Sequence, residues 1–389
     1  MKIEDICTRI CSGGTPKSGK AEYYENGTIP WLNTKEINFN RIQATETFIT
    51  EEGLNNSSAK WIKPHAVIVA MYGATAGRVA VAETPLTTNQ ACCNLEVDET
   101  IADYRYVYYW LKQNFDSIAG LANGGAQQNL SAKVIRQIEI NLPDLIKQRS
   151  IANFLDSFDS KIETNAKLNG YLADAVDGLF EKALGQAEEK TLTDVVEILS
   201  GGTPKTKISE YWEDGEIPFF GPGDANGSTY CLTTAKRITQ LGLENCNSEL
   251  YPVDTVFLTA RGTVGKVAMA GKPMAMNQSC FAFRGLGVSQ PAVYQIIKRA
   301  VRSLKAKANG ATFAAINTRD LKIETILVPS AEELTAFEEE AASLHSMMRV
   351  NEEESLKLSS LRDALLPKLI AGEIDVSKID FMQLNSHLV

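Results

Sequence analysis

Two stretches of the chain place apolar side chains at alternating steps of three and four residues, which is the spacing of a coiled-coil seam. In residues 144–185 the seam consists of Leu155, Phe158, Ile162, Asn165, Asn169, Leu172, Val176, Leu179 and Ala183. The positions 186 residues later are Ala341, Leu344, Met348, Asn351, Ser355, Leu358, Arg362, Leu365 and Leu369. The pattern predicts two long helices, the first about 60 Å long, and the obvious partner for each helix is the other.

Polar residues interrupt both seams near their centres. Asn165 of the first seam falls on Asn351 of the second when the two stretches are aligned. A polar residue at a seam position lowers stability but fixes the register of the two helices. We interpret Asn165 and Asn351 as a pair that sets this register, and two independently solvated side chains are the alternative.

The segments before each predicted helix have the pattern of mixed α/β domains. Residues 66–73 and 255–262 are β-branched runs bounded by glycine, which favours strands. Amphipathic helices are expected over 103–118 and 291–308, the second with Ser289 as a cap.

These elements divide the chain into five parts, of which the short linker 186–190 and the tail are expected to be loose connections. The parts are a first domain (1–143), a long helix with its linker (144–190), a second domain (191–329), a second long helix (330–371) and a C-terminal tail (372–389).

The two halves of the chain repeat one another. The motif SGGTPK occurs at residues 12–17 and again at 200–205, and it is followed by EYYENGTIPW in the first copy and by EYWEDGEIPF in the second. Residues 77–93, GRVAVAETPLTTNQACC, align with residues 265–281, GKVAMAGKPMAMNQSCF. The chain is therefore one unit, a domain followed by a long helix, made twice. Antiparallel pairing of the two helices would give the molecule a pseudo-two-fold axis.

Composition excludes several classes of protein. The chain of 389 residues is 44% hydrophobic, but it has no apolar run of 18 residues and no apolar segment near its start. We therefore expect neither a membrane protein nor an exported one. Seven cysteines form no CxxC pair and only three histidines are present, so zinc and disulfides are not expected either. The cysteines are interpreted as reduced core residues of a cytoplasmic protein.

The net charge of −9 at first argues against a partner such as DNA. Most of the negative charge lies in the two helical segments, however, and the two domains are close to neutral. A near-neutral domain can still present a basic face. The charge therefore excludes the helices, and not the domains, as a DNA-binding surface.

No signature of an autonomous enzyme is present. Residues 14–21, GTPKSGKA, nearly match the phosphate-binding pattern GxxxxGK[ST], but Ala21 replaces the metal-binding hydroxyl and the second copy lacks the second glycine. We interpret this segment as a turn that carries a lysine. No GxGxxG follows a strand, and no histidine accompanies a candidate nucleophile.

The duplicated SGGTPK segments, the duplicated GRVA…NQ and GKVA…NQ segments and the sequence LLPKLIAGEIDV at 365–376 resemble the DNA specificity subunit of type I restriction-modification systems. The resemblance covers essentially the whole chain. It implies two target recognition domains, each reading half of a split site in double-stranded DNA, joined by antiparallel helices whose length sets the spacing. It also implies two copies of an adenine methyltransferase subunit and ATP-dependent restriction subunits as partners, so this chain would be non-catalytic and need no cofactor.

The repeat itself separates two kinds of position. Both copies need the same fold but usually read different half-sites, so shared residues should serve folding or phosphate contacts, and divergent loop residues should read bases. Gly13, Gly77, Asn89, Gln90 and their equivalents Gly201, Gly265, Asn277 and Gln278 are predicted turn and strand-edge residues. The predicted phosphate contacts are Lys17, Arg78, Lys205 and Lys266, with solvated surface cations as the alternative.

The divergent loops supply the base-reading candidates, because Asn, Gln, Lys and Arg can pair with the edges of adenine and guanine. In the first copy they are Asn33, Lys35, Asn38, Arg41, Gln127 and Gln128, and in the second copy Asp224, Asn226, Arg237, Arg261, Thr312 and Arg319. For each of them a plain loop residue is the alternative.

Two other functions fit parts of the pattern. One is the specificity part of a self-contained restriction-modification enzyme, although the two repeats leave no room for a methyltransferase domain. The other is an oligomerisation or adaptor scaffold that does not itself bind DNA.

Overall fold

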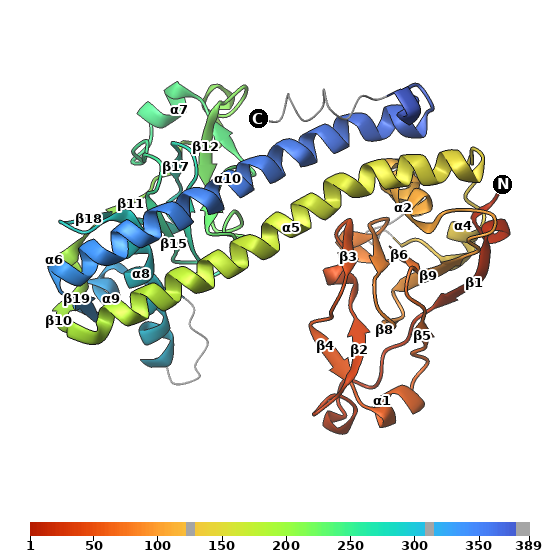
Figure 1. The fold of residues 1–389 in the computed structure, drawn as a ribbon, viewed down its shortest axis with the longest axis horizontal. Coiled ribbons are helices and arrows are strands. Elements are labelled where there is room, and N and C mark those ends of the chain that lie inside the picture. The colour runs from red at the N-terminus through yellow and green to blue at the C-terminus, as the bar shows by residue number, and fades with distance from the viewer. Residues whose placement is uncertain (122–128, 308–314, 379–389) are drawn as a thin grey trace. The chain divides into compact units, whose positions relative to one another are not determined.

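The computed structural model describes residues 1–121, 129–307 and 315–378 (Figure 1). The chain forms two compact units. The first unit contains residues 1–160 together with residues from 358 onward, and the second unit contains residues 161–357. Each long helix therefore contributes one part to the first unit and another part to the second.

The described residues of the first unit form two sheets. Their strand orders are β1-β9-β6-β7-β3 and β4-β2-β8-β5. All side chains of β6 and β7 are buried, as continuous apolar runs such as VIVA and VAVA require. The strand predicted within residues 66–73 is confirmed as β6. The strands are β1 (Cys7–Ser12), β2 (Ile29–Leu32), β3 (Asn40–Ile42), β4 (Thr47–Ile49), β5 (Trp61–Ile62), β6 (Val67–Ala70), β7 (Val79–Ala82), β8 (Leu86–Thr88) and β9 (Cys92–Val97).

Short helices complete the first unit. They are α1 (Glu51–Asn55), α2 (Tyr104–Gln113), α3 (Phe115–Gly120) and α4 (Ala132–Arg136). The single helix predicted over 103–118 is wrong in one respect, because it breaks at Asn114 into α2 and α3. The Asn114 side chain donates a hydrogen bond to the Trp110 carbonyl at 2.8 Å, and an asparagine that bonds locally in this way favours a helix end.

The second unit repeats these sheets. The orders β11-β18-β15-β16-β13 and β14-β12-β17 follow those of the first unit strand by strand, and the bridge between Tyr251 and Met274 takes the place of β5. The strand predicted within 255–262 is confirmed as β15. The strands are β11 (Val196–Ser200), β12 (Ile217–Phe220), β13 (Tyr230–Cys231), β14 (Arg237–Ile238), β15 (Val256–Thr259), β16 (Val267–Ala270), β17 (Ala275–Met276) and β18 (Cys280–Gly285).

One additional pair of strands overturns the prediction of a loose linker at 186–190. Residues Ala187–Thr191 form β10, which pairs antiparallel with β19 (Thr325–Pro329). The polar sequence AEEKT hid this strand, because it joins only one neighbour and keeps its acidic side chains in solvent. The helices of this unit are α6 (Leu192–Val195), α7 (Gln240–Glu244), α8 (Gln290–Lys307) and α9 (Thr318–Ile323). Ser289 caps α8 as predicted, accepting a hydrogen bond from the Ala292 amide at 3.4 Å.

The two long helices are α5 (Leu145–Ala183) and α10 (Ala331–Ile370), the yellow-green and blue ribbons of Figure 1. Every predicted seam position is buried or half-buried, which confirms the coiled-coil pattern. Within the second unit Asn169 contacts Asn351 and Phe180 contacts Phe337, so residue numbers rise along one helix as they fall along the other. The fold is thus mixed α/β, with two repeated domains joined by long antiparallel helices.

Polar seam residues bond across the two helices, but not in the predicted pairing. The Asn351 amide donates to the Asn169 side-chain oxygen at 2.8 Å, while the Asn165 amide donates to Glu354 at 2.7 Å and to the Ser355 hydroxyl at 3.2 Å. Asn165 reaches Asn351 only at its backbone carbonyl. In an antiparallel pair a residue does not face its own repeat equivalent unless it lies at the centre of symmetry, which explains the shifted partners.

Each domain is attached to the long helices by an equivalent ion pair. In the first unit Lys112 of α2 lies 3.6 Å from Asp363 of α10, and in the second unit Lys298 of α8 lies 2.6 Å from Asp177 of α5. Lys298 and Asp363 stand 186 residues after Lys112 and Asp177, so both partners are repeat equivalents. We call these two ion pairs the shared clasp.

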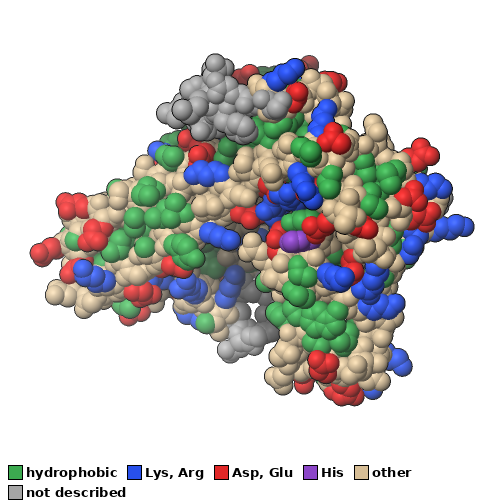
Figure 2. All heavy atoms as spheres, turned by 45° about the vertical axis from the view of Figure 1, so that its right-hand side comes forward, with side chains coloured by type: hydrophobic (Ala, Val, Ile, Leu, Met, Phe, Trp, Pro, Cys, Tyr) green, Lys and Arg blue, Asp and Glu red, His purple; other side chains and the backbone are tan. Residues whose placement is uncertain are grey.

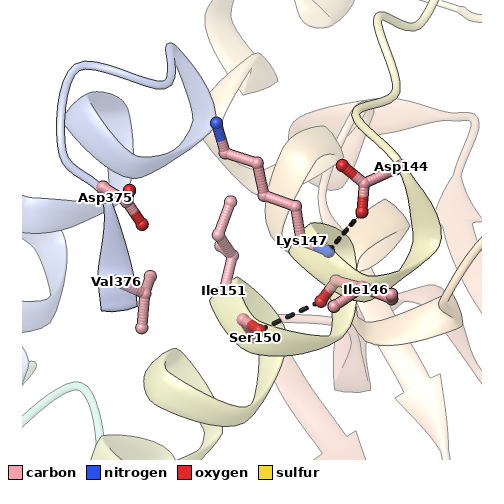
Figure 3. A pocket seen from close by; sticks show the side chains of 7 residues that line it. All are labelled: Asp144, Ile146, Lys147, Ser150, Ile151, Asp375 and Val376. Atoms are coloured by element: carbon pink, nitrogen blue, oxygen red, sulfur yellow. Dashed lines mark hydrogen bonds between the residues drawn. The ribbon is translucent and has the colours of Figure 1, made fainter. Parts of the chain in front are cut away.

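The chain beyond α10 returns to the start of α5 within the first unit. Asp144 caps α5 by accepting a hydrogen bond from the Lys147 amide at 2.9 Å. A pocket beside this first turn is lined by residues of both segments (Figure 3). The lining residues are Asp144, Ile146, Lys147, Ser150, Ile151, Asp375 and Val376. The residues from the end of α10 to Val376 are therefore part of the first unit. The prediction of a loose tail does not hold for them.

Candidate nucleic-acid interface

The SGGTPK turn packs so closely that only glycine fits. A Cβ atom on Gly13 would lie 2.1 Å from the Thr88 carbonyl oxygen, and one on Gly201 would lie 2.2 Å from the Asn277 carbonyl oxygen. The next residue but one, Thr15 or Thr203, donates its hydroxyl hydrogen to Gln90 or Gln278. The motif therefore ties a turn to a strand end in both copies, and it leaves Lys17 and Lys205 exposed just beyond.

The second shared motif forms another turn. Gly77 and Gly265 have φ angles of +87° and +79°, a region that side chains disfavour. Asn89 and Asn277 accept hydrogen bonds from the backbone amide two residues later, at 3.0 and 2.9 Å. The prediction that the shared glycine, asparagine and glutamine positions are turn and strand-edge residues is confirmed.

Five segments converge on one edge of the first unit. The Leu130 amide donates to the Met71 carbonyl at 2.7 Å, and the Met71 amide donates to the Ala91 carbonyl at 2.8 Å. The Arg78 guanidinium donates to the Asn38 side chain at 2.9 Å. Together with the Thr15 contact, these bonds join residues 15–17, 33–38, 72–78, 89–91 and 129–133, which we call the first loop edge.

The two backbone bonds recur in the second unit, and a different bond joins the variable loop. The Ile316 amide donates to the Ala260 carbonyl and the Ala260 amide to the Ser279 carbonyl, both at 2.9 Å. The Thr263 hydroxyl donates to the Pro222 carbonyl at 2.6 Å. The second loop edge therefore consists of residues 203–205, 221–226, 261–266, 277–279 and 315–319.

The first loop edge gathers most of the first-copy candidates. Asn33 caps a short turn, accepting from the Lys35 amide at 3.3 Å, and Lys35 pairs with Glu46 at 2.6 Å. Both members of that ion pair are more than 60% exposed, so little free energy opposes its exchange for another anion. Asn38 holds Arg78, and Lys17 is exposed. The remaining base-reading candidates Gln127 and Gln128 lie outside the described residues.

Arg41 differs from the other first-copy candidates. It lies in β3, beyond the loop edge, and forms ion pairs with Asp156 of α5 and with Glu83. Its side chain is only 18% exposed. The position therefore favours a contact with the helix over base reading.

The second loop edge gathers Lys205, Arg261, Lys266 and Arg319, all of them exposed. Asp224 and Asn226 also lie there, but their side chains brace the loop. Asp224 accepts hydrogen bonds from the Gly221 and Ala235 amides, both at 2.8 Å, and Asn226 accepts one from the Ser228 amide at 3.0 Å.

Two further second-copy candidates lie elsewhere. Arg237 lies in β14, which pairs with the start of β12, and it is not part of the loop edge. Thr312 lies outside the described residues.

Sequence reasoning missed one residue of the first loop edge. Lys133, in the first turn of α4, stands 186 residues before Arg319, in the first turn of α9. Both are exposed, so the positive charge is shared between copies. Arg319 therefore resembles the predicted phosphate contacts, which are shared between copies, more than the predicted base-reading residues, which differ. The alignment of the two repeats could have revealed this.

The described residues of the loop edges offer hydrogen-bond donors and cations, and two buried cysteines lie close to them in the chain. Burial raises the pKa of Cys93 and Cys280 to about 12, so these thiols stay protonated. Among residues 1–121, 129–307 and 315–378, no cluster of acidic, histidine and cysteine side chains could hold a metal ion. On the face drawn in Figure 2, basic and acidic side chains are intermixed. On this face, any preference for an anion must therefore be local.

A family model described as "Type I restriction modification DNA specificity domain" matches residues 1–172 and again residues 185–353. The chain belongs to this family. The two matches reproduce the internal repeat, each covering a recognition domain and a large part of the helix that follows it. As a member of the family, the chain provides DNA sequence specificity within a type I restriction-modification system, and catalysis belongs to other subunits.

Individual relatives agree with this assignment. The specificity subunit of the type I restriction enzyme MjaIX from Methanocaldococcus jannaschii is 26% identical, over 97% of this chain and 94% of that protein. The HindI specificity subunit of Haemophilus influenzae is 28% identical over 48% of this chain and 41% of that protein. The crystal structure of the type I S subunit from M. genitalium superposes with a TM-score of 0.56 at 18% identity, covering 95% of both chains.

Type I specificity subunits bind DNA and assemble with methyltransferase and restriction subunits. The self-contained enzyme considered from the sequence is therefore set aside. None of the helices in the described ranges is both long and apolar enough to cross a bilayer.

Proposed function

We propose that each recognition domain reads one half of a bipartite site in double-stranded DNA through its loop edge, and that α5 and α10 set the spacing between the halves. One observation carries the proposal: the same five segments form the loop edge in both repeats, with three of their four bonds in common and the fourth, to the variable loop, made by different residues. Within this constant frame, the loops 33–38 and 221–226 are identical at only one of six positions, where Asn38 aligns with Asn226. A constant frame with variable loops is the arrangement that reading two different half-sites requires.

Shared cations are assigned to the DNA backbone. Lys17, Arg78 and their counterparts Lys205 and Lys266 keep a positive charge in both copies at equivalent places on the loop edge. Phosphates are the same at every base pair, so contacts to them carry no sequence information and need not differ between copies. Lys133 and Arg319 join this group by the same reasoning.

Base reading is assigned to the loops that differ. In the first domain Asn33, Lys35 and Asn38 share one loop, and in the second domain Arg261 is the exposed loop-edge residue best suited to a guanine edge. Asp224, Asn226 and, in the first loop, Asn33 would act mainly by shaping their loops, because their side-chain oxygens already accept backbone hydrogen bonds.

In the same proposal, the chain assembles in the cytoplasm with two copies of an adenine methyltransferase subunit and with ATP-dependent restriction subunits. The repeated helices support a count of two, since a scaffold built twice offers each docking surface twice. The predicted division into domains at residues 143, 190, 329 and 371 belongs to the same proposal.

The test is to map methylated adenines in DNA exposed to the complex of this chain with its methyltransferase subunit. We expect a motif in two parts separated by a fixed gap. Arg261→Ala should relax one base pair in one part only, whereas Lys17→Ala should weaken methylation of all sequences and reduce its salt dependence by about one counterion. A single continuous motif, or a Lys17→Ala variant with an altered motif, would contradict the proposal. Loss of methylation without loss of complex assembly in a DNA-free pull-down separates a binding defect from an assembly defect.

A further inference from the structure

The first reading loop ends in a strand that is fastened to a long helix. Residues 33–38 lead directly into β3, and Arg41 of β3 forms an ion pair with Asp156 of α5. Both side chains are less than a fifth exposed. An ion pair in this partly buried setting is screened much less than one on the surface, and removing one partner leaves the other charge poorly compensated.

Asp156 is bonded from two elements of the domain at once. Besides Arg41 of β3, it accepts hydrogen bonds from the Arg105 guanidinium at 3.1 Å and from the Tyr109 hydroxyl at 2.9 Å, both on α2. Arg105 is held in turn by Asp103 at 2.7 Å. Donors from two directions fix the Asp156 carboxylate, and through Arg41 the carboxylate fixes the end of the reading loop.

The second unit has a contact at the equivalent place with different chemistry. Tyr230 of β13 stands where Arg41 stands in β3, since β13 runs parallel to β16 as β3 runs parallel to β7. The Tyr230 hydroxyl lies 3.3 Å from the His345 Nδ1 atom of α10. The strand after each reading loop is thus attached to the helix that follows its own domain, by an ion pair in one copy and by a tyrosine and a histidine in the other.

We propose that these contacts are positioning contacts: the helix holds the end of each reading loop, and so decides how that loop meets the bases. Arg41 is then a positioning residue for the first half-site, acting through residues 33–38, and Tyr230 has the same role for the second. This positioning role rests on the proposed function. It extends that function by connecting base reading to the long helices. The shared clasp attaches the same domains without touching a reading loop, so it provides a matched control.

The experiment uses the complex of the full chain with its methyltransferase subunit and a DNA library randomised in both half-sites. Arg41→Met and Asp156→Asn should each lower the preference for the favoured base in the first half-site by at least about fivefold, the scale of one base contact. The second half-site should be unaffected and reports that the chain is folded. Tyr230→Phe, which removes only the hydroxyl, should show the reverse pattern.

Three controls decide between explanations. Lys112→Met breaks the first-unit ion pair of the shared clasp and should leave both base preferences unchanged, even where the melting temperature falls. The exchanged pair Arg41→Asp with Asp156→Arg should recover part of the lost preference, which a general loss of packing would not allow. If Arg41→Met relaxes one base pair and Asp156→Asn does not, Arg41 reads a base directly and the positioning proposal is wrong.

The wild-type complex separates the two proposals. A wild type without a two-part preference overturns the proposed function, and the positioning role with it. A wild type with that preference, beside Arg41→Met and Asp156→Asn variants that keep it at both half-sites, overturns the positioning role alone.

Discussion

His345 shows how one buried side chain makes the second unit sensitive to acid. It is 3% exposed, and its ring lies against those of Tyr230 and Tyr294. Burial lowers the pKa of His345 to about 4, with Lys298 acting in the same direction and Asp254 opposing it. The ring is therefore neutral in the folded protein at pH 7, with its hydrogen bond to Tyr230 intact.

Acid should destabilise the second unit through this residue. The unfolded chain binds a proton at His345 near pH 6.5, but the folded chain does so only near pH 4. Between these values the unfolded state holds more protons, so the free energy of unfolding falls as the pH falls, by about 2 kcal/mol at pH 5. Urea titrations at pH 7 and pH 5 should show a smaller loss for His345→Phe than for the wild type. An equal loss in both proteins would exclude His345 as the cause.

At this scale the sequence predicts residues whose role is local and misses those whose role depends on a distant partner. The glycines of SGGTPK could be predicted to form turns because the motif repeats. The partner of Arg41 could not be predicted, because Asp156 lies 115 residues away and only the fold brings the two together. Arg41 was therefore grouped with the loop residues beside it in sequence.

At the scale of elements, the long helices follow from the spacing of their apolar residues, since a period near 3.5 residues leaves little choice. The contacts between them depend also on direction and register, which the period does not contain. For this reason the seam is predicted correctly while the partners of its asparagines are not. Short elements are less predictable still: the polar strand β10 and the break at Asn114 are each decided by a few backbone hydrogen bonds.

The bonded pair Asn169 and Asn351 should lower the stability of the two helices and fix their register. Replacing both Asn169 and Asn351 by leucine removes a half-buried polar pair and adds apolar contact at two seam positions, so the free energy of unfolding should rise. The same change should let the helices slide by one heptad, and the complex should then methylate sites with gaps about three base pairs longer or shorter. The measurements are a urea titration and methylation of a series of DNAs that differ only in gap length.

Two outcomes would count against this role. One is a double variant that keeps a single permitted gap. The other concerns Asn351→Leu alone, which leaves the Asn169 oxygen without its donor and should cost about 1–3 kcal/mol. If this single variant is as stable as the double variant, the asparagine pair does not act as a unit.

At the scale of the whole molecule, the compact units do not coincide with the sequence repeats. The repeat places each domain with the helix that follows it. The structure instead divides both helices, giving residues 161–357 to one unit and the two remaining pieces to the other. Sequence periodicity could not reveal this division, because it depends on which parts of the two helices lie against which domain.

This division predicts different behaviour for two fragments. Residues 161–357 carry both of their helix segments on one continuous piece of chain, so this fragment should fold alone with a cooperative thermal transition. Residues 1–160 lack the segment of α10 that carries Arg362 and Asp363, partners of Asp159 and Lys112. That fragment should be less cooperative, and adding a peptide of residues 358–378 should restore a sharper transition. Circular dichroism melts measure both, and a fragment 1–160 as cooperative alone as with the peptide would contradict the division.

The discontinuity of the first unit also has a consequence during synthesis. A ribosome releases residues 1–160 early, but the stretch from Leu358 onward emerges only after the whole of the second unit has been made. The first unit, although it is translated first, therefore remains incomplete while the second unit already has both of its helix segments. A nascent chain that stops short of residue 358 would therefore carry a complete second unit and an incomplete first unit.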